Sequence, residues 1–282
     1  MANTDPNDLI TKIDAEDEDS IDQIDENGEG HENDAADQDS SDEGDWKETL
    51  KTVVIAVFIA LVIRTVAYEP FNIPSGSMKP TLLVGDYLFV SKFSYGYSRY
   101  SLPFGLPLIP GRVLFSEPER GDVAVFKLPS DNTTDYIKRI VGLPGDKLQV
   151  IKGILHINGK AVKRRHAGEH VERDEWSGRF QRIPRFLETL PNGVEHFILE
   201  ETDSGFGDNT QVYEVPDGHY FGMGDNRDRS KDSRYLTDVG FIPRENLVGR
   251  AEFKFFSVDG AAWKFWKWPS SLRLSRFFEG IE

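Results

Sequence analysis

The chain has 282 residues, enough for one large domain or two smaller ones around a sizeable apolar core. It contains no cysteine, which excludes disulfides, thiolate metal sites and a cysteine nucleophile. Residues 1–46 hold 18 of the 48 acidic residues and one of the 33 basic residues, so most of the formal charge of −15 lies there. The remaining 30 acidic and 32 basic residues are nearly balanced, and no nucleic-acid partner is expected.

The acidic tail, residues 1–46, has no aromatic residue before Trp46 and only scattered isoleucines. Such a composition cannot bury enough apolar surface to offset the entropy lost on ordering. We predict that the tail is disordered and solvated. A docking role for this block of negative charge is the alternative.

An unbroken apolar run, TVVIAVFIALVI, occupies residues 52–63 between Lys51 and Arg64. Twelve helical residues span about 18 Å, less than the roughly 30 Å hydrocarbon core of a bilayer. The apolar stems of Lys51 and Arg64 can reach opposite interfaces, which extends the usable helix to about Glu48–Tyr68 and puts Trp46 and Tyr68 at the two headgroup levels. The predicted span is residues 47–68. We predict one transmembrane helix.

A cleavable signal peptide is the alternative for this segment. The 46-residue acidic leader is the reverse of a short basic n-region, and no small-x-small site follows the apolar run. We therefore predict an uncleaved anchor. Lys47 and Lys51 before the helix, against Arg64 at its end, favour by a thin margin a cytoplasmic N-terminus and an exported bulk.

Beyond the anchor, short apolar or alternating runs separated by turn residues indicate β-strands. Asn158-Gly159 is a strong signal for a type I′ hairpin, and residues 143–146, Leu-Pro-Gly-Asp, for a turn. Past residue 70, only residues 270–278 have a helical period, so the predicted fold is mainly β. The predicted strands are residues 87–93, 122–128, 135–142, 147–162 and 197–200.

Residues 163–214 are more polar and less regular than the strands around them. A surface insertion or a small second domain would produce this texture. We place an inserted smaller β-rich domain at residues 147–216. Residues 69–146 and 217–282 then form the main β domain.

The stretch PSGSMKP contains two serines, Ser75 and Ser77, between Pro74 and Pro80. The prolines stiffen the backbone and Gly76 permits a close approach, so a hydroxyl and several N–H groups can converge on one point. Hydrolysis of an acyl bond by serine needs this combination. Taken alone, a Ser-Gly-Ser loop is usually only a turn.

A serine nucleophile also needs a proton acceptor. None of the six histidines lies in a stretch built around it, and His219 in DGHYFGMGDN is the least implausible of them. In DYIKRIVG, strand alternation puts Lys138 and Arg139 on opposite faces, so one of these cations must point inward if both faces are covered. A buried lysine amine can become a neutral base at physiological pH, whereas arginine cannot. On this strand alone, a lysine that reaches the surface stays the alternative.

Four motifs follow the apolar helix in order: PSGSMKPTLLVGDYLFV, RGDVAVFKLP, YIKRIVGLPGDKL and GDNRDRSKDSRYLTDVGFIPRENLVGRA. Together they resemble bacterial type I signal peptidase over about residues 46–270. The resemblance implies that Ser77 is the nucleophile and Lys138 the general base. It also implies that Ser75 donates to the oxyanion together with the backbone N–H of Ser77, and that Ser230 orients the lysine amine.

The same resemblance implies a coiled antiparallel-sheet catalytic domain with a β-rich insertion, preceded by one N-terminal transmembrane helix. It implies a substrate as well: exported preproteins cut beside small-x-small sequences such as Ala-x-Ala, on the outer face of the bacterial inner membrane. We expect no metal and no cofactor. An enzyme anchored in the same membrane as its substrate meets it at a high effective concentration.

The segment GDNRDRSKDSR also contains a sparse calcium-loop pattern, Asp228-x-Ser230-x-Asp232. The intervening basic residues repel a cation, and the glycine and terminal glutamate of such a loop are missing. We expect an ion-paired scaffold near the site instead. Arg229 departs from the family pattern, in which asparagine is common, and puts the local hydrogen bonding in question. The predicted supporting residues are Asp225, Asp228, Asp232, Arg234 and Arg139.

Two segments, residues 94–115 and 261–278, mix aromatic and aliphatic residues with cations. Core packing and contact with a lipid interface both explain this mixture. Two other functions also stay open: a self-cleaving serine/lysine regulator of related fold, and a noncatalytic membrane-tethered β module. The anchor disfavours the first, and the paired serine and lysine motifs disfavour the second.

Overall fold

The computed structural model describes residues 42–102, 105–173, 178–260 and 263–281. Residues 1–41 of the predicted disordered tail therefore lie outside the described residues. Helix α1 (Asp42–Val66) begins four residues before Trp46, the end of the predicted tail. Its stretch Trp46–Val66 has 21 residues, a mean hydropathy of 2.1 and no buried residue, so it is long and apolar enough to cross a membrane.

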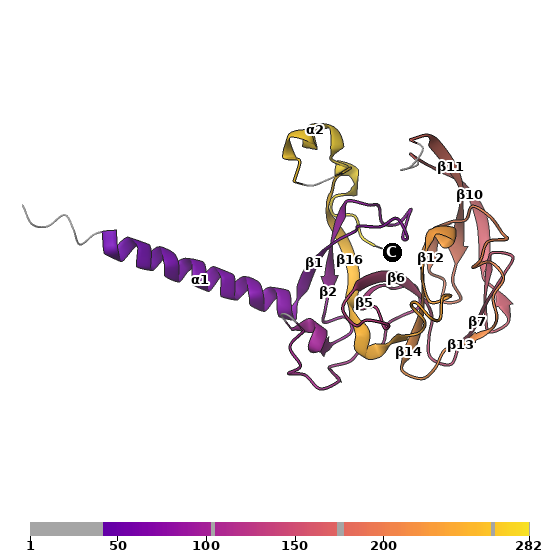
Figure 1. The fold of residues 1–282 in the computed structure, drawn as a ribbon, viewed down its shortest axis with the longest axis horizontal. Helices are drawn as coiled ribbons and strands as arrows, with labels where there is room; N and C mark the ends of the chain where they lie inside the picture. Colours follow the sequence, from indigo (N-terminus) through magenta and orange to yellow (C-terminus); the bar gives the residue numbers. More distant parts are fainter. Residues whose placement is uncertain (1–41, 103–104, 174–177, 261–262, 282) are drawn as a thin grey trace, which may run out of the picture. The chain divides into compact units, whose positions relative to one another are not determined.

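Seven antiparallel strands form the main sheet, in the order β1-β2-β16-β5-β6-β14-β15 (Figure 1). Register shifts interrupt the pairing of β16 with β2 and β5, and of β14 with β6. Such bulges bend strands and increase their twist, so the sheet curls. The predicted coiled antiparallel sheet is confirmed. Its strands are β1 (Tyr68–Asn72), β2 (Asp86–Ser91), β5 (Val123–Lys127), β6 (Asp135–Gly142), β14 (His219–Met223), β15 (Ile242–Pro243) and β16 (Leu247–Ser257).

Strand β6 matches the predicted strand, residues 135–142, at both ends. Both of its faces are covered: Ile140 packs with Phe126 and Tyr220, whereas its neighbour Val141 packs with Leu148 and Phe221. A strand buried on both faces can place two adjacent side chains in two different interiors. The side chain of Lys138, on the same strand, can therefore be buried in one interior while that of Arg139 is buried in the other.

The strands between residues 147 and 216 form two further sheets. One has the order β13-β7-β8-β9 and the other β10-β11-β12. Val150 and Leu155 of this segment share one apolar cluster with Val141 and Phe221 of the main sheet, so the two parts have a common core. The bounds are β7 (Lys147–Ile151), β8 (Ile154–Ile157), β9 (Lys160–Ala161), β10 (Lys163–Arg173), β11 (Phe180–Thr189), β12 (Glu195–Leu199) and β13 (Tyr213–Glu214).

Residues 163–214, the more polar part of the predicted β-rich insertion, begin with two strands. Strands β10 and β11, of 11 and 10 residues, form a long antiparallel hairpin whose register shifts between His166 and Glu169. Most β10 side chains are exposed or only partly buried, so its sequence carries no apolar alternation from which a strand can be predicted. The predicted Asn158-Gly159 turn is confirmed, with φ of 52° and 76° at its two residues.

Residues 270–278 do not form one helix. Leu272 makes a β-bridge with Val258, which ends α2 (Trp268–Ser271) after four residues. A second two-stranded sheet pairs β3 (Tyr97–Ser98) with β4 (Arg112–Val113). The 3₁₀ turns are η1 (Arg99–Ser101), η3 (Arg227–Arg229), η4 (Arg244–Asn246), η5 (Phe265–Lys267) and η6 (Leu274–Arg276).

The two aromatic segments differ in how their residues are used. In residues 94–115, Tyr95 is buried in the core, but Leu108 and Leu114 are exposed. Near the C-terminus, Trp263 and Trp266 expose 68% and 58% of their surface. Core packing therefore explains Tyr95 but not these two tryptophans.

Candidate active site

Ser77 lies in the loop between β1 and β2 and is partly buried. The next residue, Met78, is fully buried in the core, and its packing there fixes the loop. Asn226 holds its backbone: the Asn226 N–H donates to the Ser77 carbonyl (3.1 Å), and its side-chain amide donates to the Gly76 carbonyl (3.1 Å). The backbone around Ser77 is thus held on fixed partners.

Lys138 lies in the middle of β6 and is only 3% exposed. Its Nζ lies 2.9 Å from Ser77 Oγ and 2.8 Å from the carbonyl oxygen of Ile137. The neighbouring Arg139 is also buried, on the other face of the strand. The alternative in which Lys138 reaches the surface is therefore wrong, and burial of both cations goes further than the alternation required.

Burial lowers the pKa of Lys138 from its ordinary value to about 8, because the interior solvates an ammonium poorly. The carboxylates of Asp232 and Asp225 act in the opposite direction and raise it. An amine with this pKa is neutral in a useful fraction of molecules near neutral pH. A neutral amine at hydrogen-bond distance can accept the proton of a serine hydroxyl.

Two glycines near the end of β14 give the serine and lysine their room. A methyl group on Gly222 would lie 3.0 Å from Lys138 Cβ, and one on Gly224 only 2.5 Å from the Ser77 carbonyl oxygen. These contacts leave no space for a side chain at either position. The sequence analysis missed both residues, although the close pair in HYFGMGDN is a usable signal.

The buried ion pair of Arg139 with Asp225 supports this site. Arg139 donates to both carboxylate oxygens (2.9 and 2.8 Å), and Thr81 Oγ1 donates to one of them (2.5 Å). Burial alone would raise the pKa of Asp225, but Arg139 holds it below its ordinary value. Loss of one partner from such a buried pair typically costs about 3–5 kcal/mol of stability.

A second buried pair, Asp232 with Arg234, completes the scaffold. Arg234 donates to both oxygens of Asp232, each at 2.9 Å. Asp232 also accepts the backbone N–H of Gly224 at 3.0 Å. The backbone of Gly224, next to the Ser77 carbonyl, is therefore hydrogen-bonded to Asp232, the carboxylate whose negative charge raises the pKa of Lys138.

The three remaining predicted site residues, Ser230, Asp228 and Ser75, have different surroundings. Ser230 Oγ is buried, and the expected bond from it to the Lys138 amine is absent within the described part of the chain. The Ser230 hydroxyl instead helps to lower the pKa of Asp232. Asp228 accepts the backbone N–H groups of Glu201 (2.5 Å) and Thr202 (3.1 Å), and thus supports a loop of the insertion. Ser75 is exposed.

The alternatives for this region gain no support. Asp228 and Asp232 turn to different partners, and over residues 42–102, 105–173, 178–260 and 263–281 no group of three or more His, Asp or Glu side chains is arranged to hold a metal ion. The ring of His219 contacts the backbone oxygen of Asp217 at 3.0 Å. Among the described residues, no hydrogen bond joins that ring to a serine.

Comparison with known proteins decides the family. Residues 46–256 match the family model described as signal peptidase, peptidase S26. The chain belongs to this family. Signal peptidase I of Rickettsia typhi is 43% identical over 254 residues, which cover 83% of this chain and 94% of that protein. Signal peptidase I of Rickettsia prowazekii is 42% identical over the same shares.

A crystal structure of a signal peptidase I from Enterococcus faecalis is also similar, with 25% identity and a TM-score of 0.29. The match covers 48% of this chain and 97% of that one. Family membership confirms the predicted resemblance and the prediction of a serine peptidase. A noncatalytic β module is therefore rejected.

The chain also carries a buried ionic network that the sequence analysis missed. Arg227 donates to both oxygens of Glu188, at 3.1 and 2.5 Å. His196 Nε2 lies 3.3 Å from Glu188 and 4.0 Å from Asp225. This network continues the Arg139–Asp225 pair into the insertion. Arg227 lies within the same GDNRDRS motif, but its partner on β11 is not predictable from that motif.

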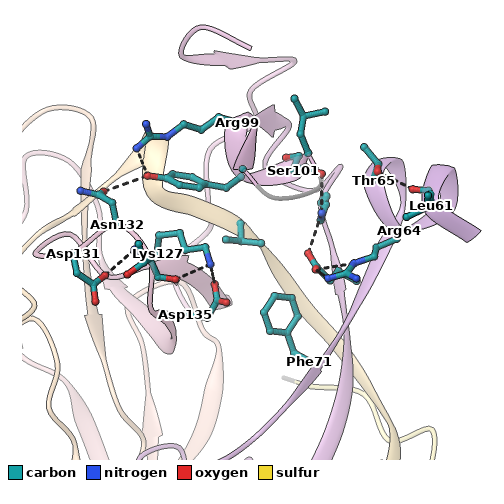
Figure 2. A pocket seen from close by; sticks show the side chains of 17 residues that line it. Leu61, Arg64, Thr65, Phe71, Arg99, Ser101, Lys127, Asp131, Asn132 and Asp135 are labelled. Atoms are coloured by element: carbon teal, nitrogen blue, oxygen red, sulfur yellow. Dashed lines mark hydrogen bonds and ion pairs between the residues drawn. The ribbon is translucent and has the colours of Figure 1, made fainter. Parts of the chain in front are cut away.

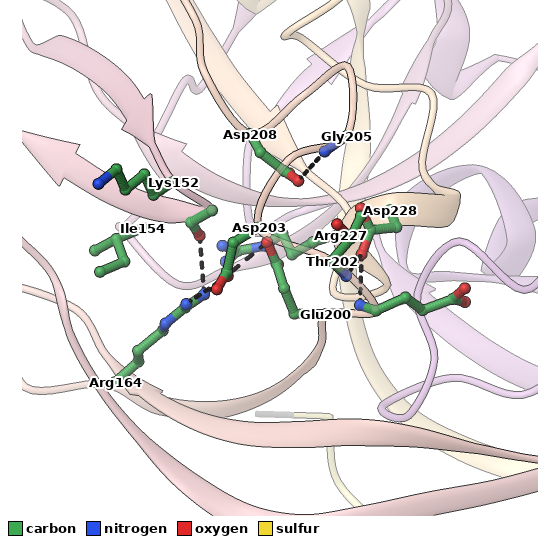
Figure 3. A network of polar contacts seen from close by, with 12 residues as sticks. Lys152, Ile154, Arg164, Glu200, Thr202, Asp203, Gly205, Asp208, Arg227 and Asp228 are labelled. Atoms are coloured by element: carbon green, nitrogen blue, oxygen red, sulfur yellow. Dashed lines mark hydrogen bonds and ion pairs between the residues drawn. The ribbon is translucent and has the colours of Figure 1, made fainter.

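Glu200 is another buried group that the sequence did not reveal (Figure 3). It is 3% exposed, neither carboxylate oxygen has a hydrogen-bond partner among the described residues, and Arg164 Nη1 is 3.9 Å away. Burial, together with the nearby charges of Asp228 and Asp208 and against the opposing charge of Arg227, raises the pKa of Glu200 to about 8. The carboxyl group is therefore mostly protonated at neutral pH.

A cavity of about 630 Å³ lies between the C-terminal end of α1 and the main sheet (Figure 2). Arg64 at the end of α1 pairs with Glu69 (2.6 Å), and Lys92 pairs with the same carboxylate (3.0 Å). Neither Ser77 nor Lys138 lines this cavity. The candidate catalytic residues and this cavity are thus separate features.

Proposed function

We propose that Ser77 and Lys138 are the catalytic dyad of a membrane-anchored endopeptidase that removes signal peptides from exported preproteins. The chain is a serine peptidase of the signal peptidase family. The observation that carries the assignment is the 2.9 Å separation of Lys138 Nζ from Ser77 Oγ in a buried setting. The lowered pKa of Lys138 supports it.

In the proposed first step, the neutral amine of Lys138 takes the proton of the Ser77 hydroxyl while Oγ attacks the scissile carbonyl carbon. The tetrahedral intermediate collapses, the peptide bond breaks, and the new ammonium returns its proton to the leaving amine. A water molecule then attacks the acyl-enzyme, with Lys138 again as the base. The hydroxyl of Ser77 is restored and the signal peptide is released as an acid.

The developing oxyanion needs hydrogen-bond donors. We assign this role to the backbone N–H of Ser77 and the hydroxyl of Ser75, as the family resemblance implies. Ser75 is exposed, which leaves its hydroxyl accessible to a bound substrate. Asn226 holds the carbonyls of Gly76 and Ser77, so the peptide units beside this donor have fixed orientations.

We assign the substrate as a preprotein cut after a small-x-small sequence, since shallow pockets admit only small side chains. The α1 segment Trp46–Val66 supports anchoring in the bacterial inner membrane, with the sheet domain on its outer face. Exposed Trp263 and Trp266 support contact with the lipid interface. Membrane attachment raises the effective concentration of a membrane-held substrate.

Cleavage of a purified preprotein with an Ala-x-Ala site tests the dyad. Wild-type protein should cut it, whereas Ser77→Ala and Lys138→Ala should not, although both variants keep the wild-type circular dichroism spectrum. Intermolecular cleavage also separates this function from that of a self-cleaving regulator. Substantial cleavage by either folded variant would reject the assignment.

The oxyanion role of Ser75 has its own test. Ser75→Ala should lower kcat by about 10²–10³, equivalent to about 2.7–4 kcal/mol of transition-state stabilisation, because one donor is lost. Ser75→Thr keeps a hydroxyl and should recover part of the rate. An unchanged turnover in Ser75→Ala would remove this residue from the role.

The absence of cysteine makes the orientation directly measurable. A membrane-impermeant maleimide should label Lys160→Cys, in the sheet domain, from the outer face of intact inner membranes. It should label Ser20→Cys, in the tail, only after lysis. The reverse labelling pattern would contradict the proposed topology.

A further inference from the structure

One carboxylate connects the inserted hairpin to the loop that carries Ser77. Glu172, in β10, accepts Lys79 Nζ at 2.5 Å and Arg229 Nη1 at 3.1 Å. Lys79 follows Ser77 by two residues, and Arg229 directly precedes Ser230. We call Lys79, Glu172 and Arg229 the Glu172 clasp.

The clasp acts on the serine loop through the Lys79 side chain. That side chain lies across Gly76: a methyl group there would be 2.9 Å from Lys79 Cε and 3.4 Å from Nζ. The backbone N–H of Lys79 also donates to the Gly76 carbonyl (3.2 Å). Lys79 therefore contacts the residue between Ser75 and Ser77 through both its backbone and its side chain.

The clasp is more than an exposed ion pair, which would contribute little. The side chains of Glu172 and Lys79 are only 10% and 17% exposed, and two cations share one carboxylate. Removal of that carboxylate would leave Lys79 and Arg229 without their common counter-charge. The ammonium would then be free to leave Gly76.

Arg229 extends the clasp to further residues of the insertion. Besides Glu172, Arg229 donates to Gln181 of β11 (2.9 Å) and pairs with Glu201 (2.5 Å). Its long planar side chain thus joins both strands of the hairpin to the turn η3. An asparagine at this position is too short to reach all three partners.

From these contacts we propose that Glu172 is a positioning residue for the peptidase reaction. It fixes Lys79 across Gly76 and so holds the loop that presents Ser77, which makes the β10–β11 hairpin part of the active-site structure. Glu172 touches no reacting atom. This inference rests on the proposed role of Ser77.

The test compares Glu172→Gln with Glu169→Gln in the full chain. Glu169 lies on the same strand and makes an exposed cross-strand pair with Arg182 (3.2 Å), so its variant is a matched control. We measure kcat and KM on a preprotein, the rate at which a serine-directed acylating probe labels Ser77, and Tm. Glu172→Gln should lower kcat and the labelling rate by about 10- to 100-fold with KM nearly unchanged, since a misplaced nucleophile costs rate more than binding. Glu169→Gln should match the wild type.

Lys79→Met provides a second route if Glu172→Gln folds poorly. It should show the same loss of kcat, and the double variant should be no worse than the poorer single variant, because both changes release one contact. Wild-type kcat in Glu172→Gln, or losses that add in the double variant, would overturn the inference. Cleavage by Ser77→Ala would instead reject the proposed function itself.

Discussion

Two buried ionisable groups in different parts of the chain reach the same pKa from opposite directions. Lys138 in the main sheet and Glu200 at the end of the insertion strand β12 are each 3% exposed. Burial lowers the pKa of the first to about 8 and raises the pKa of the second to about 8. The interior disfavours the charged form of both, whatever its sign.

Their surroundings differ. Lys138 Nζ has the Ser77 hydroxyl at 2.9 Å, but neither oxygen of Glu200 has a hydrogen-bond partner among the described residues. A shifted pKa therefore does not by itself mark a catalytic group; it does so only when a reactive atom lies within reach. Substitution of Lys138 should therefore affect activity, and substitution of Glu200 should affect only stability.

The largest expected difference is in activity. Lys138→Met should reduce preprotein cleavage by at least about 10⁴-fold, because the serine loses its base. Glu200→Gln should stay within about threefold of the wild type, since no reactive group contacts its carboxyl among the described residues. Initial rates of the two purified variants measure this. A comparable loss in Glu200→Gln would give that residue a role in the reaction that its contacts do not predict.

The next largest effect is on stability, at Glu200. Between pH 4.5 and about 8, folded Glu200 keeps a proton that the unfolded chain releases, so the free energy of unfolding falls as pH rises through this window. The full loss by pH 9 is at most about 5 kcal/mol. Glu200→Gln removes this pH dependence, and urea unfolding of the full chain in detergent at pH 5, 7 and 9 should show it. Parallel curves for wild type and variant would contradict the raised pKa.

The sequence predicted the serine and lysine elements for clear physical reasons. Strand β6 ends where its turn residues begin, and alternation required that Lys138 or Arg139 point inward if both faces of the strand were covered. The four ordered motifs then assigned the serine to the lysine although 61 positions separate them. The positions of Ser77 and Lys138 were thus predictable from strand alternation and from the order of the motifs.

Long-range polar contacts were not predictable. Glu172 meets Lys79 across 93 positions, and alternation on an exposed hairpin does not say which carboxylate faces which cation. Glu200 follows an ordinary apolar strand, and only the packing around it removes water. The expected bond from Ser230 to Lys138 failed for the same reason, because a motif gives proximity but not the rotamer of a hydroxyl.

A smaller effect concerns the stability cost of Lys138. Folded Lys138 loses its proton near pH 8, whereas the unfolded side chain keeps its proton to about pH 10.5. Below pH 8, burial of the ammonium therefore lowers the free energy of unfolding by up to about 3 kcal/mol, and this cost disappears as the pH rises from 8 to 10.5. Lys138→Met should therefore be inactive yet more stable than the wild type at pH 7. Equal or lower stability of the variant would show that the amine is better solvated than its burial indicates.

The smallest effect is the dependence of rate on pH, about 1.4 kcal/mol of transition-state free energy per pH unit. Only the neutral amine can accept the Ser77 proton, so kcat/KM should rise tenfold per pH unit below the pKa of Lys138 and level off above about 8. Glu200→Gln should have the same profile, because the protonation of its carboxyl does not reach Ser77. A midpoint near 6.5 would instead indicate a histidine base and remove Lys138 from its role.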